Sequence, residues 1–211
     1  NGEYLQMFGV VLSEIGQEAV GEKLLQTGIE FNISNPARYQ IYALWLLNHN
    51  RKESGINNIK KALSLEPLRT KEYIAMMLLN GLSDEEISRA LPAMVDTHVF
   101  FAEYLLLSGK EEMAENSYMN ALTYAENEKE VSPSIFFKIY TYYRNKKLYE
   151  DALTVMRKAV QKLPDDINIR LSTAVAYEEA GIFYKAAEEY KKVLLLDPAN
   201  VFAQKKLKKI Q

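Results

Sequence analysis

Five segments of the chain repeat one pattern of small and large side chains. A small residue stands at the same place in each segment, namely Gly21, Gly55, Ala114, Ala152 and Ala186. Four residues later each segment has a large apolar residue, namely Leu25, Ile59, Tyr118, Met156 and Tyr190. The first two segments are 34 residues apart, and so are the last two. A period of this length is typical of two-helix repeats that stack into a solenoid.

Small residues at these places have a direct structural use. Two helices approach to about 8 to 10 Å only where a short side chain lies between them. In the last full segment, from Ile167 to Asn200, apolar residues recur every three or four positions, as in an amphipathic helix. Gly181 provides a helix stop in the middle of this segment, and Pro198 follows its second helix. Each segment therefore predicts a hairpin of two helices.

This order of small and large residues, closed by a proline such as Pro67, Pro164 or Pro198, resembles the tetratricopeptide repeat (TPR) family over nearly the whole chain. The resemblance implies an all-α fold, an α-α superhelix (TPR solenoid) of about five full helix hairpins, one shortened hairpin and a C-terminal capping helix. It implies a single array over residues 1–211. The expected repeats are 2–35, 36–69, the shortened 70–94, 95–128, 133–166 and 167–200, followed by the capping helix 201–211.

Several positions depart from the repeat pattern. Tyr140 stands where the other repeats have Gly or Ala, so we expect its ring to turn outward or its helix to stand off from its partner. Glu126 replaces the closing proline, which predicts a looser joint before the next repeat. In the shortened hairpin, Ser83 and Glu86 form a capping-box pattern. In the capping helix we expect an apolar stripe of Val201, Leu207 and Ile210, with four lysines facing outward.

Composition restricts the partners and the chemistry. The chain has 26 Lys and Arg against 28 Asp and Glu, a net charge of −2, so we expect no nucleic-acid partner. It has no Cys, and no apolar run approaches the roughly 18 residues of a membrane-spanning helix. The first repeat is already under way at Glu3, so we expect the chain to be part of a longer protein.

Catalytic and metal-binding patterns are not found in the sequence. The two histidines, His49 and His98, have no ligand or acid/base neighbour at helical spacing. We expect His49 to lie at a helix end and His98 to be exposed or half-buried. We therefore expect no enzyme activity, no metal and no cofactor in this segment.

The superhelix implied by the family assigns residues to an inner, concave groove. Three consecutive turns of the first helix of each full repeat supply this predicted groove set. Its members are Gln6, Val10, Ser13, Gln40, Leu44, Leu47, Val99, Glu103, Leu106, Phe137, Thr141, Arg144, Leu171, Val175 and Glu178. The set is mixed but mostly apolar, which favours an extended or helical peptide with large apolar side chains. Relatives that clamp a C-terminal carboxylate use Lys and Asn where Gln6 and Val10 stand, so we do not expect that specificity.

The leading interpretation is a non-enzymatic scaffold that binds a protein or peptide in the concave groove. A second interpretation is the extracytoplasmic TPR domain of a membrane protein similar to bacterial O-antigen ligases or polymerases, because the shortened hairpin between full repeats resembles theirs. A third is self-assembly through the ends of the array, where apolar surface is uncovered. The second interpretation predicts a periplasmic location, and a cytoplasmic location is the alternative.

Overall fold

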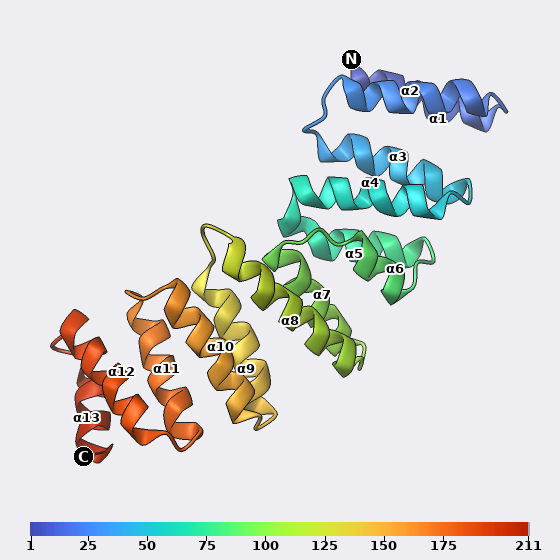
Figure 1. Ribbon diagram of the computed structural model, residues 1–211. Coiled ribbons are helices and arrows are strands. Elements are labelled where there is room, and N and C mark those ends of the chain that lie inside the picture. Colours follow the sequence, from blue (N-terminus) through green and yellow to red (C-terminus); the bar gives the residue numbers. More distant parts are fainter. Residues whose placement is uncertain (211) are drawn as a thin grey trace. The chain divides into compact units, whose positions relative to one another are not determined.

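The computed structural model describes residues 1–210, and all regular structure in that range is helical. Residue 211, the last position of the predicted capping helix, lies outside the described residues. The chain forms two compact units, the first of which is Asn1–Ala121 and the second of which begins at Leu122. Each unit is a series of antiparallel helix pairs, which confirms the all-α fold expected from the repeats (Figure 1).

The first unit contains the hairpins of the N-terminal half. Its helices are α1 (Gly2–Glu14), α2 (Glu18–Glu30), α3 (Pro36–Asn48), α4 (Lys52–Leu65), α5 (Thr70–Leu79), α6 (Asp84–Ala90), α7 (Val95–Leu107) and most of α8 (Glu111–Asn127). A 3₁₀ turn, η1 (Pro67–Arg69), precedes α5. The helices α5 and α6 are the shortest of the unit, and they form the hairpin predicted to be shortened.

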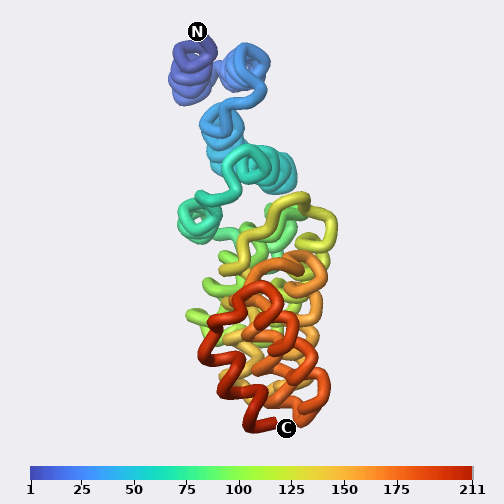
Figure 2. The backbone as a smooth tube through the Cα atoms, turned by 90° about the vertical axis from the view of Figure 1, so that its left-hand side faces the viewer, coloured from blue at the N-terminus to red at the C-terminus, as the bar shows by residue number. Residues whose placement is uncertain are grey.

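The second unit contains the end of α8 and five further helices. These are α9 (Pro133–Asn145), α10 (Tyr149–Lys162), α11 (Ile167–Glu179), α12 (Phe183–Leu196) and α13 (Val201–Ile210). Figure 2 follows the backbone of these orange and red hairpins as they lie one beside the next. Within this unit α10 packs on α9 and α11, and α12 packs on α11 and α13, as in a solenoid.

The first hairpin is held unusually close by glycines. A Cβ atom on Gly9 of α1 would lie 2.6 Å from the carbonyl oxygen of Gly21 on α2. A Cβ on Gly21 would lie 2.5 Å from the carbonyl oxygen of Gly9. Gly2 and Gly28 make a second crossing of the same kind. The backbones of α1 and α2 are therefore in close contact at two crossings.

Burial of the repeated small and large residues explains how the hairpins stack. In the second unit Ala174 and Ala186 are fully buried and Tyr190 fills the space beside them. Leu207 and Ile210 of α13 pack on this cluster, as the stripe predicted. Val201, the third member of that stripe, is instead 74% exposed, whereas Ala203 in the same turn is fully buried in the cluster.

Tyr140 settles one of the two expectations made for it. Its side chain is only 6% exposed, so the ring does not turn outward. The Tyr140 hydroxyl donates to Glu179 of α11 at 3.4 Å, and the Arg144 guanidinium lies 5.9 Å from the ring centre. Burial raises the pKa of Tyr140 to about 12. The large ring is accommodated because its polar end reaches a carboxylate at the edge of the next hairpin.

The predicted capping box is confirmed at the start of α6. Ser83 Oγ accepts from the backbone N–H of Glu86, and the Glu86 carboxylate accepts from the backbone N–H of Ser83. Two of the otherwise unsatisfied donors at the helix start are thereby paired. This fixes the turn that begins at Gly81, which has φ of +73°.

Candidate functional site

An apolar pocket of about 560 Å³ opens between α5 and α7 in the first unit. We call it the α5–α7 pocket. Its lining residues are Lys71, Ile74, Ala75 and Leu78 of α5, and Phe100, Glu103, Tyr104, Leu106 and Leu107 of α7. Nearly all of this wall is aliphatic or aromatic, and one cationic and one anionic side chain stand at its edge.

Helical spacing places these side chains on facing surfaces. On α5, Lys71, Ala75 and Leu78 follow one another at four and three residues, so they share one face. On α7, Phe100, Tyr104 and Leu107 have the same spacing. The two first helices of neighbouring hairpins thus present apolar stripes to the same space.

The floor and the rim of the pocket differ in exposure. Ile74 is 3% exposed and forms part of the packed floor. Leu78 is 39% exposed and Leu107 is 91% exposed at the rim. Exposed leucines beside an apolar hollow mark a surface where a bound partner would bury apolar side chains.

Charged and polar groups surround one side of the pocket. The Lys71 ammonium lies 2.9 Å from Glu103 Oε2 and 5.1 Å from the centre of the Phe100 ring. The Tyr104 hydroxyl donates to Asp84 Oδ1 at 2.9 Å, and Lys110 forms an ion pair with the same carboxylate. Burial and the hydrogen bond to Asp84 raise the pKa of Tyr104. These contacts fix the side chains at the rim. They place the Lys71 ammonium, a donor, and the Glu103 carboxylate, an acceptor, beside the α5–α7 pocket.

Two members of the predicted groove set, Glu103 and Leu106, line the α5–α7 pocket. Val99, one turn earlier on α7, is only 2% exposed and is therefore part of the core. The residues of α5 were missing from the set because the shortened hairpin was given no groove positions. The repeat period would have found two of them, since Ile74 and Leu78 lie 34 residues after Gln40 and Leu44.

The α1 members of the predicted set are largely internal. Gln6 is fully buried, and its amide donates to the carbonyl oxygens of Leu25 and Arg38, both at 3.0 Å. Ser13 is 8% exposed. Val10 packs against the core of the first unit. Gln6 and Ser13 thus join helices to one another and leave no surface for a partner.

Ser13 belongs to a polar cluster that fastens α1 to the end of α3. Trp45 Nε1 donates to Ser13 Oγ at 2.9 Å, and His49 Nε2 lies 3.1 Å from the same oxygen. His49 stacks on Trp45 with ring centres 4.1 Å apart, and its Nδ1 lies 2.7 Å from the Trp45 carbonyl oxygen. His49 is the C-cap residue of α3, as its sequence position predicted. The cluster serves packing, because each polar atom has a partner within it.

The α3 members of the predicted set are half-buried. Gln40 contacts the sulfur of Met76 on α5, with its amide nitrogen at 3.5 Å. Leu44 is half-buried on the same helix. Leu47 lies against Gly55 of α4 and fills the space that a larger residue there would need.

The second unit holds the remaining six members, on α9 and α11. Phe137, Leu171 and Val175 are half-buried, whereas Thr141 is exposed. Arg144 is exposed and pairs with Glu179 of α11 at 2.6 Å. Glu178 accepts hydrogen bonds from the Tyr190 hydroxyl at 2.5 Å and from Lys206 of α13 at 2.7 Å. The carboxylate of Glu178 is therefore occupied in holding the last helix.

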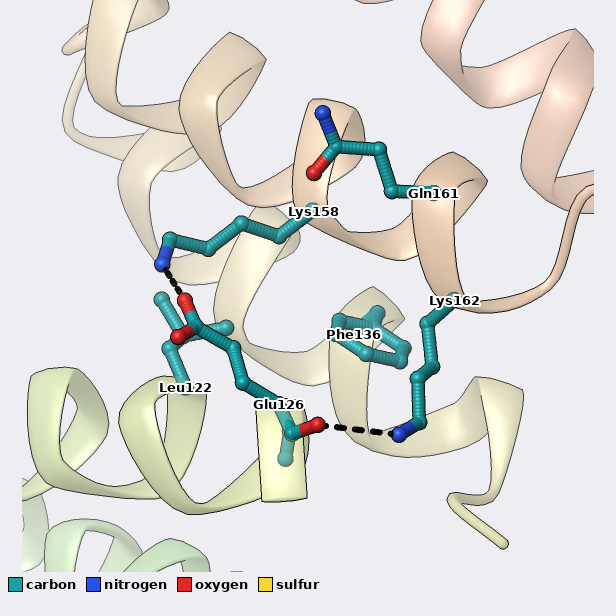
Figure 3. Close-up of a pocket in the computed structure, with 7 residues that line it drawn as sticks. Leu122, Glu126, Phe136, Lys158, Gln161 and Lys162 are labelled. Atoms are coloured by element: carbon teal, nitrogen blue, oxygen red, sulfur yellow. Dashed lines mark hydrogen bonds and ion pairs between the residues drawn. The ribbon is translucent and has the colours of Figure 1, made fainter. Parts of the chain in front are cut away.

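A smaller hollow, of about 210 Å³, lies at the end of α8 in the second unit (Figure 3). Lys158 of α10 forms an ion pair with Glu126, and this lowers the pKa of the Glu126 carboxyl. Lys162 donates to the Glu126 carbonyl oxygen at 3.2 Å. Figure 3 shows both lysines reaching from α10 toward Glu126, with the buried Phe136 between them. Glu126, at the position where the sequence predicted a looser joint, thus forms two contacts with α10.

Neither a metal site nor a membrane span is seen in residues 1–210. No three side chains of the His, Cys, Asp or Glu type in that range are placed to hold an ion together. No helix of the described part combines the length and the apolar character needed to cross a bilayer.

Comparisons with known proteins point to one repeat family. No family model matches the chain. Over 165 residues the chain is 27% identical to tetratricopeptide repeat protein 17 of Danio rerio, a match that covers 77% of the chain and 13% of that protein's length. The chain thus spans about an eighth of the curated relative it matches.

Solved structures with similar folds include two TPR proteins. One is the C-terminal part of a TPR repeat-containing protein from Cytophaga hutchinsonii, with a TM-score of 0.47, 15% identity, and coverage of 97% of this chain and 69% of that one. Another is YrrB, described as a TPR protein with an unusual peptide-binding site, with a TM-score of 0.45, 19% identity, and coverage of 87% and 97%. The repeated small and large residues, the helix hairpins that they form and the match to the Danio rerio protein all support a relationship to the tetratricopeptide repeat family.

Proposed function

We propose that the chain is a protein-interaction scaffold and that its α5–α7 pocket takes a large apolar side chain of a bound peptide segment. The observation that carries the proposal is the pocket itself, an apolar hollow of about 560 Å³ bordered by exposed leucines. A hollow of this size is in the range of ligand pockets, which run from about 300 to 1,000 Å³.

The chemistry of the rim suggests the kind of segment. Leu78, Leu106 and Leu107 offer aliphatic contact to a Leu, Met or Phe side chain. Lys71 and Glu103 at the edge can pair with polar groups on either side of that anchor. Burying one such anchor contributes roughly 1.5 to 3 kcal/mol, which corresponds to a tenfold or larger change in Kd.

A catalytic role has no comparable support in the pocket. Its ionisable groups are a lysine and a glutamate that pair with each other and a tyrosine bound to Asp84. None of them forms a nucleophile and base pair, which an acyl-transfer or hydrolytic site requires. The interpretation as an extracytoplasmic domain of an O-antigen ligase-like protein rests on the order of the repeats alone.

The test uses a library of random 12-residue peptides displayed on phage and selected on the wild-type chain. Affinities of the selected synthetic peptides are then measured for Leu78→Glu, Leu107→Glu and Leu79→Glu. Leu79 is the matched control, because it is 88% exposed on the same helix and does not line the pocket.

We expect at least a tenfold loss of affinity for Leu78→Glu and Leu107→Glu, and no change for Leu79→Glu. All three leucines are at least 39% exposed, so the fold should survive, as circular dichroism would show. If all three variants bind the selected peptides equally well, the α5–α7 pocket is not the binding site.

A further inference from the structure

The α5–α7 pocket is longer than a hollow for one side chain. Its α5 wall runs from Lys71 to Leu78, and its α7 wall runs from Phe100 to Leu107. At 1.5 Å per residue each wall is about 10 Å long, which is two helical turns. Pockets of about 300 to 1,000 Å³ hold drug-sized ligands, so a volume of about 560 Å³ has room for several side chains.

The length of these walls suits a bound helix better than a bound extended segment. On one face of an extended segment the side chains recur every second residue, about 6.6 Å apart, so a wall of about 10 Å receives only two of them. A helix places residues i, i+3 or i+4, and i+7 on one face within the same length. A helix therefore brings three apolar side chains into the pocket where an extended segment brings two.

The lining has no free hydrogen-bonding side chain for the backbone of a partner. Its polar members are Lys71, Glu103 and Tyr104. Lys71 pairs with Glu103 at 2.9 Å, and the Tyr104 hydroxyl donates to Asp84 at 2.9 Å. A backbone N–H or C=O group that is buried without a partner costs as much as a lost hydrogen bond. A helix avoids this cost, because its backbone groups pair with one another.

The middle of the α5 wall leaves room for a close approach. Ala75 lies there, between Lys71 and Leu78, and it is exposed. Two helices approach to about 8 to 10 Å only where the side chains at their contact are short. A third helix can therefore lie directly against α5 at Ala75.

The outer edge of the pocket is lined by ammonium groups. The side chain of Lys71 is 63% exposed and that of its partner Glu103 is 25% exposed. Lys110 stands outside its partner Asp84 in the same way, with 47% against 5%, beside Tyr104. An ammonium has three donors, so each lysine can bind a second carboxylate while it keeps its first. This edge complements acidic residues on a partner.

We infer that the occupant of the α5–α7 pocket is an amphipathic helix with apolar residues at i, i+3 or i+4, and i+7 and with acidic residues beside them. This inference rests on the proposed function, because it names the partner of the same site. The apolar stripe of the helix lies between α5 and α7, and its acidic residues reach Lys71 and Lys110. Such a complex is a helix-in-groove contact, in which apolar anchors at these spacings fill a hydrophobic groove.

Two synthetic peptides of about 18 residues and identical composition test the shape of the occupant, at a length that allows a stable helix. Both contain only Leu, Ala, Glu and Gln. In the helical peptide the leucines recur at three and four residues, and in its isomer they recur at every second residue. Calorimetric titration gives the affinity of each peptide for the wild type, Leu78→Glu and the control Leu79→Glu.

We expect the isomer to bind the wild type at least tenfold more weakly than the helical peptide. Leu78→Glu should weaken the helical peptide at least tenfold, whereas Leu79→Glu should bind it as the wild type does. In the complex, ¹³C-labelled Cα atoms of the helical peptide should have the NMR shifts of a helix.

A third peptide tests the charge of the edge. It is the helical peptide with Lys in place of every Glu. We expect it to bind at least threefold more weakly than the Glu peptide at 50 mM NaCl, and the difference should shrink at 500 mM NaCl because salt screens exposed charges. Lys71→Gln should also narrow the difference. Equal affinity of the Glu and Lys peptides at low salt would exclude the acidic edges.

The outcomes distinguish this inference from the proposed function. If the isomer binds as tightly as the helical peptide and Leu78→Glu weakens it, the pocket takes an extended segment and the helix is excluded. If the helical peptide does not bind the wild type, or binds Leu78→Glu equally well, the inference is also wrong. In each case the proposed function stands if the phage-selected peptides still depend on Leu78, and it fails as well if they do not.

Discussion

His98 is a buried histidine that takes no part in the candidate site. It is only 5% exposed within α7, although its position near a helix start suggested an exposed or half-buried ring. Ser117 of α8 donates to the His98 carbonyl oxygen at 2.9 Å, and its hydroxyl also lies 3.4 Å from Nδ1. Burial lowers the pKa of His98 to about 4, with a smaller contribution from Lys60. The ring is therefore neutral at pH 7.

This burial predicts a pH dependence of stability. Below pH 6.5 the unfolded chain binds a proton at His98 that the folded chain does not bind, so the free energy of unfolding falls as pH falls from about 6.5 to about 4. The full difference is about 3 kcal/mol. Urea unfolding at pH 7.5 and pH 4.2 should show a smaller loss for His98→Gln than for the wild type. An identical loss in both would mean that His98 titrates normally in the folded state.

The sequence predicted the helices well, but it did not predict which individual side chains are buried. The period of small residues predicted the hairpins, and the Ser83 pattern predicted the cap of α6, because both depend on spacing along one or two helices. His98, Tyr140 and Gln6 are buried and contact helices other than their own. A repeat alignment does not contain those contacts. The α5–α7 pocket was missed in part for a related reason, since it arises where a full repeat follows a shortened one.

The α1–α2 hairpin tests how the repeat depends on its small residues. Gly21→Ala adds a Cβ 2.5 Å from a backbone oxygen of α1, which cannot move without shifting the helix. Gly55→Ala, at the equivalent place in the next repeat, meets the side chain of Leu47 at 2.8 Å. We expect Gly21→Ala to lower the free energy of unfolding by roughly 1 to 3 kcal/mol. Gly55→Ala should cost less, since Leu47 can rotate and alanine favours a helix by about 1 kcal/mol over glycine.

Thermal and urea unfolding of the two variants provide the comparison. The matched substitution removes the effect of helix propensity, which is the same at both positions. If Gly55→Ala is the more damaging of the two, the close approach of α1 and α2 does not limit the residue at position 21.

Across the whole molecule, the main contacts join helices of the same or adjacent hairpins. A solenoid of this kind has a stability that is close to a sum of local terms and nearest-neighbour terms. A substitution that destabilises one hairpin should therefore affect mainly that hairpin and its neighbours.

Ala186→Arg provides the corresponding test. Ala186 is fully buried between α11 and α12, so an arginine there overpacks the pair and costs roughly 1 to 3 kcal/mol or more. Hydrogen exchange should show faster amide exchange throughout α11, α12 and α13, because α13 packs on the same cluster. Exchange in α1 to α4 should stay as in the wild type, and Ala199→Arg, at an exposed loop position, should change neither region. Equal loss of protection in the first four helices would show that the two units unfold as one cooperative body, because damage confined to the last hairpin would then have spread along the entire array.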